Sequence, residues 1–233
     1  MPAIDVHHIS IQIIYLYLFK RDLMKYICIL IACLAVMSCK KEEVQPPDQN
    51  NDPIPPPSPI IDLSSHFIGN IGGGTVELTQ NVFGYDGVAD DSLYINSSPI
   101  LSEAVYSSSM ESTSALMAIK ILHGSAFWDY SVSTKPTLAQ FNDFHLADTI
   151  PSYASNGLSG FEVIFTDNSG VIWKSAPSSV NAQNVLFNNM ILESGGNGDF
   201  AKYNCNFTCY VYNAGASDSL LIDNAILQGW FKR

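Results

Sequence analysis

Residues 160–173 read GFEVIFTDNSGVIW, and this stretch decides the fold class. Its first half places Phe161, Val163 and Phe165 at every second position, which is the side-chain period of a β-strand. The tetrapeptide DNSG at 167–170 follows, and clusters of Asp, Asn, Ser and Gly form tight turns. A second β-rich run, VIWK, comes directly afterwards. The stretch therefore predicts an antiparallel β-hairpin.

Short β-rich runs recur along residues 60–233. They cover residues 75–79, 92–96, 116–122, 185–192, 202–213, 218–222 and 226–231. Strands at a spacing of roughly 8–12 residues with turn signals between them are typical of a β-sandwich or barrel. A chain of this length buries about 70% of its unfolded surface, which is enough for a single core. We therefore expect residues 60–233 to form one all-β, antiparallel β-sandwich.

One segment departs from the strand period and predicts a single short helix. The i, i+3, i+7 spacing of one helix face is met by Leu138, Phe141 and His145. Pro136 favours the start of a helix, and Thr134 is a possible N-cap. We expect a helix over about Pro136–Phe144 that covers one end of the sandwich. His145 beside its apolar face is expected to be packed rather than to act as a ligand.

Two cysteines, Cys205 and Cys209, lie in the folded part of the chain. On a strand with ~3.3 Å per residue they are about 13 Å apart, whereas a disulfide needs Cα atoms within roughly 7 Å. The two thiols therefore should not bridge each other. They share one strand face with Tyr203, Phe207 and Val211, which predicts buried thiols that pack as small hydrophobic side chains. Zinc or redox chemistry would need more ligands or a Cys-x-x-Cys spacing.

Upstream of the folded part, residues 24–43 read MKYICILIACLAVMSCKKEE. The apolar run Tyr26–Met37 is too short to cross a bilayer, which takes about 20 residues, and it suits the roughly 7–15 residues of a secretory signal. It ends at Val36-Met37-Ser38-Cys39, which resembles a bacterial lipobox. We expect cleavage before Cys39 and a diacylglycerol on its thiol. A rival lipobox ends at Cys33, but apolar residues would follow it, and a cleaved signal with an ordinary cysteine is the other alternative.

This signal peptide divides the chain into four parts. Residues 1–23 precede it and indicate either a start-site artefact, with translation beginning at Met24, or an extended n-region. Residues 24–38 form the signal peptide itself. Residues 39–59 begin with the lipidated cysteine and become proline-rich, which predicts an extended tether before the sandwich of residues 60–233. Each buried CH₂ contributes about 0.8 kcal/mol, so two or three acyl chains would hold the protein stably on a membrane.

The lipobox, the hairpin of residues 160–173 and the ending from Cys205 to Phe231 are similar to those of small Bacteroidetes surface lipoproteins. The acidic pair Glu42–Glu43 resembles the surface-export signal of that group. The resemblance implies an outer-membrane protein that is lipid-anchored and exposed at the cell surface, with an all-β body. It implies no catalytic residue, because the group has no assigned activity.

Composition and motifs exclude several classes of function. From Cys39 onward, 20 Asp and Glu stand against 8 Lys and Arg, and so acidic a surface repels nucleic acid. The glycines at 72–74 lack the Gly-Lys-Ser/Thr of a phosphate loop and predict a turn before a strand. The histidines His66, His123 and His145 are scattered, which argues against a metal triad. Residues 86–91, DGVADD, could supply oxygen ligands for calcium, but a solvated acidic turn is the favoured interpretation.

The remaining candidates are aromatic residues. Trp128 and Tyr130 flank Asp129 between a predicted strand and the predicted helix, and flat rings beside a carboxylate suit stacking on a sugar. The favoured interpretation, however, is that Trp128 fills the core, as large aromatic residues usually do.

These observations predict a lipid-anchored envelope protein that acts as a non-enzymatic binding or assembly module. We expect no catalytic, cofactor or metal site. The membrane is the expected partner of the lipid, and the partner of the sandwich is a glycan or an envelope protein. Two alternatives stay open: a carbohydrate-binding surface lipoprotein that uses Trp128 and Tyr130, and a small secreted hydrolase with unrecognised acidic residues.

Overall fold

The computed structural model describes residues 58–176, 183–215 and 217–233. The predicted signal peptide, Cys39 and nearly all of the predicted tether lie outside these residues. The described fold lies within one compact unit, Pro56–Arg233. No described helix has the length and the apolar content that crossing a lipid bilayer requires.

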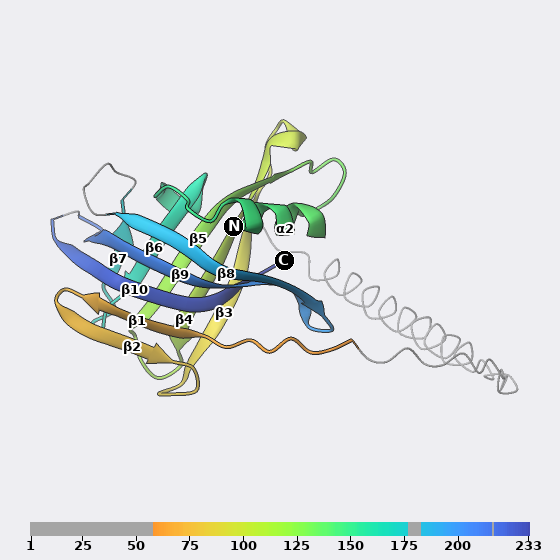
Figure 1. Cartoon of the computed structure of the whole chain (residues 1–233). Coiled ribbons are helices and arrows are strands. Elements are labelled where there is room, and N and C mark those ends of the chain that lie inside the picture. The colour runs from red at the N-terminus through yellow and green to blue at the C-terminus, as the bar shows by residue number, and fades with distance from the viewer. Residues whose placement is uncertain (1–57, 177–182, 216) are drawn as a thin grey trace, which may run out of the picture. The chain divides into compact units, whose positions relative to one another are not determined.

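The described residues form an antiparallel all-β fold of ten strands with one short α-helix, which confirms the predicted fold class (Figure 1). The strands are β1 (His66–Ile71), β2 (Gly74–Thr79), β3 (Tyr85–Tyr94), β4 (Ser102–Ser112), β5 (Ala118–Trp128), β6 (Gly160–Thr166), β7 (Ile172–Ser175), β8 (Asn184–Gly195), β9 (Gly198–Asn213) and β10 (Ser219–Lys232). Between them lie the helix α2 (Leu138–Ala147) and two 3₁₀ turns, η1 (Pro99–Leu101) and η2 (Ser155–Gly157).

One strand, β9, joins the two layers of the sandwich. The sheet runs in the order β2-β1-β10-β9-β7-β6-β5-β4-β3, and β8 pairs with β9 beside this path. Along β9, Gly198–Thr208 pairs with β8, and Val211–Asn213 pairs with β7. One layer contains β8, β9, β10, β1 and β2, and the other contains β3 to β7 (Figure 1). The hydrophobic core lies between these layers.

The hairpin predicted at residues 160–173 is present as β6 and β7, with Phe165 paired to Trp173. The Asp167 carboxylate holds its turn. Oδ1 of Asp167 accepts hydrogen bonds from the backbone N–H groups of Ser169 (2.8 Å) and Val171 (3.0 Å), and Oδ2 accepts one from the Trp173 indole (3.1 Å). The indole hydrogen bond is the main cause of the lowered pKa of the Asp167 carboxyl. The Asp167 carboxylate is therefore ionised at neutral pH and can accept all three hydrogen bonds.

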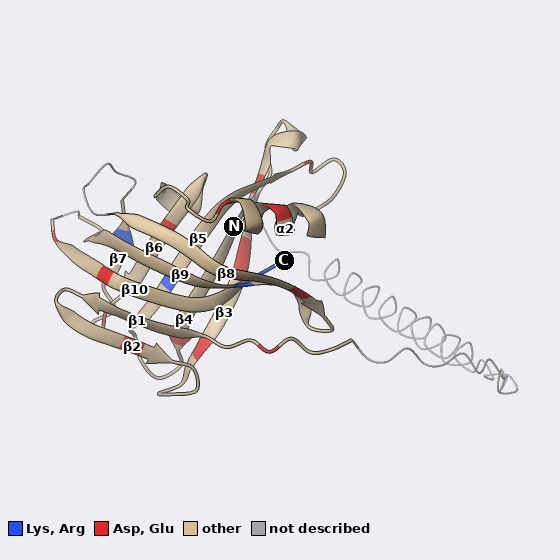
Figure 2. Ribbon diagram, viewed as in Figure 1, with Lys and Arg blue, Asp and Glu red and all other residues tan. Residues whose placement is uncertain are grey.

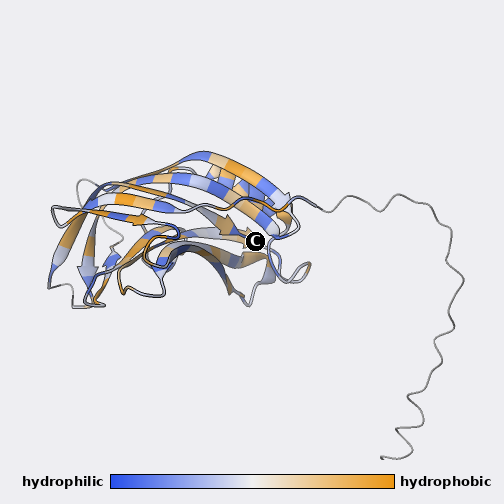
Figure 3. Cartoon of the chain, turned by 90° about the horizontal axis from the view of Figure 1, so that it is seen from below, coloured by the Kyte–Doolittle hydropathy of each residue, from blue (hydrophilic) through white to orange (hydrophobic). Residues whose placement is uncertain are grey.

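Alternation along β9 builds the centre of the core. Its inward side chains are at most 3% exposed and include Tyr203, Cys205, Phe207, Cys209 and Val211. Both cysteines are free thiols, as predicted, and burial raises the pKa of each, to about 12 for Cys209. They pack as small hydrophobic side chains rather than as nucleophiles. Figure 3 shows the same alternation of hydrophobic and hydrophilic residues along the other long strands.

Residues 86–91 belong to the edge strand β3, which corrects the prediction of an acidic turn. All of β3 pairs with β4, from Tyr85 opposite Ser112 to Tyr94 opposite Glu103. Asp86 and Asp90 therefore occupy alternate positions on one face of a strand and do not converge on a shared centre. Charged residues on an edge strand discourage pairing with other chains.

β10 corrects a second prediction, because it is one strand where the sequence indicated two. Its pairing with β9 is interrupted between Ile222 and Ala225 by a bulge, and Asn224 there has a φ of 49°. Asparagine tolerates this left-handed conformation better than most residues, and a bulge absorbs extra residues without ending the strand. The polar pair Asp223–Asn224 therefore marks a kink rather than a turn.

The helix α2 confirms the predicted short helix but begins at a different residue. Its N-cap is Thr137, not Thr134. Oγ1 of Thr137 accepts from the Gln140 backbone N–H (3.3 Å), and the Gln140 side chain accepts from the Thr137 N–H (2.9 Å). This reciprocal capping box needs Glu or Gln three residues after the cap, and Thr134 lacks one. The cap aims the buried Phe141 and His145 into the core.

We predict that Thr137→Ala lowers the free energy of unfolding by about 1 kcal/mol, because the Gln140 backbone N–H at the start of α2 loses the hydroxyl oxygen that accepts its hydrogen bond. Thr134→Ala is the matched control and should change stability by less than about 0.5 kcal/mol. Urea unfolding followed by circular dichroism measures both. Equal losses for the two variants would contradict the assignment of the cap.

Candidate functional site

Trp128 and Tyr130, the two residues predicted to contact a glycan, lie in different environments. Trp128 ends β5 with only 1% of its surface exposed, and its indole N–H donates to the Ser133 carbonyl (2.9 Å). Tyr130 is 40% exposed in the loop that follows. The ring of Trp128 is therefore part of the core, and Tyr130 is the member of the pair that a ligand can reach.

Two histidines that are scattered in the sequence meet in the core. His123 on β5 and His145 on α2 are fully buried, with 5.5 Å between their ring centroids. Nε2 of His123 lies 3.0 Å from Oδ2 of Asp148, just beyond the end of α2. His66, on β1, contacts Glu77 instead. The rings around the pair are those of Tyr106, Phe141, Phe144, Phe187 and Phe231.

The surroundings of the histidine pair keep both imidazoles neutral. His145 lies parallel to Phe231, with 4.7 Å between ring centroids, and neither of its ring nitrogens has a hydrogen-bond partner among the described residues. Burial lowers its pKa well below the ordinary value, and the nearby His123 lowers it further. Burial also lowers the pKa of His123, against the opposing effect of Asp148. Since a general base needs access to a substrate, this pair serves packing, as predicted for His145.

Neither metal nor nucleophile chemistry is assembled in the described part of the chain. No group of three or more His, Cys, Asp or Glu residues there is arranged to hold a metal ion. Oγ of Ser125 donates to Oε2 of Glu103 (2.5 Å) and accepts from the Ser159 N–H (3.0 Å). No described histidine bonds to this serine, because the imidazoles contact other residues or none. The Ser125 contact therefore connects β5 to the loop after η2 and forms no catalytic pair.

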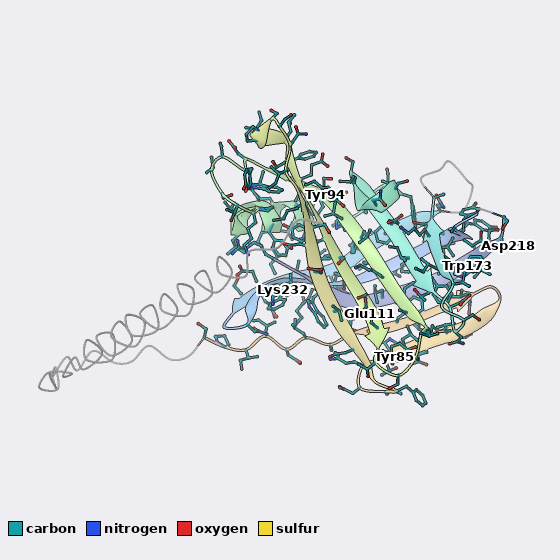
Figure 4. The ribbon with its side chains drawn as sticks, turned by 180° about the vertical axis from the view of Figure 1, so that it is seen from behind. Tyr85, Tyr94, Glu111, Trp173, Asp218 and Lys232 are labelled. Atoms are coloured by element: carbon teal, nitrogen blue, oxygen red, sulfur yellow. The ribbon has the colours of Figure 1, made fainter. Side chains whose placement is uncertain are left out.

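A surface hollow lies where the two layers join, at the pairing of β7 with β9. Its volume is ≈ 570 Å³, and its lining consists of Ile172, Lys174, Ala176, Tyr212, Asn213 and Ala214. Lys174 and Tyr212 are direct cross-strand partners, so their side chains project from the same face and lie in contact range. Ile172 is two residues before Lys174 and shares that face. Figure 4 shows this outer side of β3 to β7, with Trp173 and Asp218 labelled near the hollow.

The chemistry of the hollow is mainly apolar, with a few polar groups held in place. Ile172 is 52% exposed and Tyr212 is partly exposed, so an aliphatic side chain and an aromatic ring face the solvent together. Oδ1 of Asn213 accepts from the Ser217 N–H (3.2 Å), which orients the amide. The ammonium group of Lys174 has no ion pair among the described residues. Such a site can hold a small ligand by stacking, by apolar contact and by charge.

The residues of the hollow were missed by sequence reasoning, although one signal for them existed. The alternation that buries Cys209 and Val211 places Tyr210 and Tyr212 on the opposite face of β9, where exposed aromatic rings are unusual. The pairing of Tyr212 with Lys174 joins strands that are not consecutive in the chain, and local periodicity carries no information about it.

Comparison with known proteins identified no relative: no family model matches the chain, and no curated protein or solved structure matches it. Its function therefore has to be inferred from the chemistry of its own residues.

We predict that His145→Leu reduces the sensitivity of the fold to acid. Burial places the folded pKa of His145 below the unfolded value of about 6.5, so the unfolded chain binds more protons at low pH. Above pH 6.5 the neutral His145 makes its full contribution to the free energy of unfolding. This contribution is lost as the pH falls from about 6.5 toward the folded pKa, by up to about 1.4 kcal/mol per pH unit. A leucine at this position does not titrate, so the variant should not lose stability in this way. At pH 7 the substitution should lower the free energy of unfolding by less than about 1.5 kcal/mol, since leucine and histidine have similar volumes.

Urea unfolding at several pH values between 7 and 5 measures this difference. The ionisable side chains packed against His145 are Tyr106 of β4 and His123 of β5, and both remain in the variant. His66→Gln, which removes a surface imidazole, is the control and should retain the wild-type pH dependence. A wild-type slope in His145→Leu would show that another group controls the acid response.

Proposed function

We propose that this protein is a lipid-anchored component of the cell envelope whose β-sandwich is a non-catalytic binding module. The hollow at the β7–β9 junction carries the proposal, because it offers an aromatic ring, an aliphatic side chain and an ammonium group on paired strands. Ligand sites typically occupy roughly 300–1,000 Å³ and combine an apolar lining with a few placed polar groups. A hollow of ≈ 570 Å³ with this lining matches that description.

The anchoring half of the proposal rests on the lipobox. An acylated Cys39 would fix the chain to a membrane, and the proline-rich residues that follow would extend the sandwich away from the lipid surface. The acidic residues after Cys39 support placement in the outer membrane with exposure at the cell surface. A binding module in that position meets its ligand outside the cell.

A glycan is the ligand that the chemistry of the hollow favours. A sugar ring stacks on an aromatic ring through its C–H groups, and its hydroxyls exchange hydrogen bonds with amides and ammonium groups. Tyr212, Asn213 and Lys174 supply these three kinds of contact in one place. Recognition of an envelope protein is the other candidate. The hydrolase alternative is weaker, because the buried histidines and Ser125 form no nucleophile–base pair in the described structure.

We predict that Cys39→Ser abolishes lipid attachment. The variant should fail to incorporate a labelled fatty acid and should move from the membrane to the soluble fraction, because no sulfur is present at that position to carry the diacylglycerol. Cys33→Ser is the matched control and should remain acylated. Labelling that survives in Cys39→Ser and is lost in Cys33→Ser would assign the anchor to the rival lipobox.

We predict that Tyr212→Ala weakens glycan binding by about fivefold, since an aromatic stacking contact contributes about 1 kcal/mol. The measurement is binding of the detergent-solubilised, acylated protein to an array of bacterial and host glycans. Tyr130→Ala removes an exposed tyrosine from another loop and is the matched control, with wild-type binding expected. Loss of binding in Tyr130→Ala alone would place the ligand there, and unchanged binding in Tyr212→Ala would exclude the hollow as the site.

A further inference from the structure

Two lysines flank one isoleucine on the outer face of the sheet beside the hollow. The register pairs Lys120 of β5 with Ile164 of β6, Ile164 with Lys174 of β7, and Lys174 with Tyr212 of β9. These four residues form one straight row across four neighbouring strands, and we call them the lysine–tyrosine row. Since neighbouring strands lie ≈ 4.8 Å apart, the two lysine backbones are about 10 Å apart. Both side chains project from the same face as the Tyr212 ring.

The two lysines of this row keep their charge available to a ligand. Lys202 and Arg233 form ion pairs with Glu193 and Asp199, whereas neither Lys120 nor Lys174 has an ion pair among the described residues. This is notable in a chain with a formal net charge of −11, where acidic partners are abundant. Figure 2 shows acidic residues spread over both layers and a basic position on β7.

Two acidic residues on the same sheet face, Glu162 and Glu111, do not neutralise the lysines of the row. Glu162 lies two residues from Ile164 on the same face of β6, but it is 3% exposed, and burial raises the pKa of its carboxyl although Lys174 opposes this. On β4, Oε1 of Glu111 accepts a hydrogen bond from Oγ of Ser109 (2.7 Å). These two carboxyl groups therefore lower the positive potential of the row without forming an ion pair with either lysine.

The sheet face at the lysine–tyrosine row suits a saccharide better than a peptide. Peptides often bind sheets by adding a strand to a free edge. At the row, β7 is paired on both sides, with β6 and β9, and β9 is paired with β7 and β10, so the backbone offers no free edge. A ligand there meets side chains of the row and the hollow, which include two ammonium groups, the Ile164 and Ile172 side chains and one phenol ring.

We propose that the ligand of the hollow is an anionic oligosaccharide, with carboxylate or sulfate groups held by Lys120 and Lys174 and a sugar ring stacked on Tyr212. This inference rests on the proposed binding function and adds the charge of the ligand and the residue Lys120, which lies outside the lining of the hollow. Two charges about 10 Å apart on the ligand would engage both lysines at once. Lys174 is exposed and Lys120 is partly exposed, so both ammonium groups can keep contact with water when a ligand binds.

The test compares uronate-bearing, sulfated and neutral oligosaccharides of equal length, together with a hexaglutamate peptide, as ligands of the acylated protein in detergent. We expect binding of the anionic sugars to exceed that of the neutral sugars and of the peptide. Raising NaCl from 50 to 500 mM should weaken the binding severalfold, since exposed charge pairs are screened. Lys120→Gln and Lys174→Gln should each weaken it about threefold, and the double variant about tenfold.

Control variants separate charge at the row from net charge and from folding. Lys135→Gln, an exposed lysine in the loop before α2, changes the net charge equally and should bind like the wild type. Lys174→Arg keeps the positive charge and should retain most of the affinity. Unchanged urea midpoints in all of these variants would show that the fold is intact.

The outcomes distinguish this inference from the proposed function. Tyr212-dependent binding of neutral sugars that ignores salt and both lysines would overturn the inference and keep the binding function. Preference for hexaglutamate over every sugar would also overturn it, in favour of an acidic protein partner. Anionic binding that Lys135→Gln weakens as much as Lys174→Gln would show non-specific attraction and overturn it as well. Absence of binding to any saccharide or to the peptide would overturn the inference and the glycan-binding proposal together.

Discussion

The alternation of buried and outward side chains along β9 from Ala201 to Tyr212 is the constraint on which the rest of the structure depends. This 16-residue strand is paired along both edges, so it cannot slip by one residue without moving its buried side chains to the surface. The buried series that includes Cys205 and Val211 fills the core between the layers. The outward series places Tyr212 beside Lys174, where β9 passes from β8 to β7. The register of β9 therefore determines both which side chains pack in the core and which ones reach the surface.

The core tolerates polar groups that are kept neutral. Two imidazoles and two thiols are buried among aromatic rings, and burial shifts the pKa of each group toward its uncharged form. A neutral His145 loses hydrogen bonds to water, yet its ring still packs against Phe231 as an aromatic side chain. The buried histidines and cysteines are therefore unreactive, because packing keeps them uncharged and out of reach of a ligand.

Chemistry that a ligand can reach lies on the outer face of the sheet. The body is acidic overall, which favours solubility and discourages non-specific association with nucleic acid and anionic membranes. Against that background, a local row of two lysines and a tyrosine is a selective feature rather than a general attraction. In our proposal, the lipid on Cys39 determines where the protein is and this row determines what it holds. The proline-rich segment would separate these two proposed functions in the chain.

The sequence by itself determined the all-β class, the hairpin of β6 and β7, the free buried cysteines and the one short helix near residues 136–144. Each of these features depends on local periodicity or on local turn chemistry. The predicted lipobox lies outside the described residues and stays a prediction. The choice of Thr137 over Thr134 as the cap, the joining of β10 across its bulge and the inclusion of residues 86–91 in β3 were decided by hydrogen-bond partners in the folded chain. Only the tertiary structure brought His123 to His145 and Lys120 and Lys174 to Tyr212, since pairing between distant strands depends on how the whole sheet buries its core.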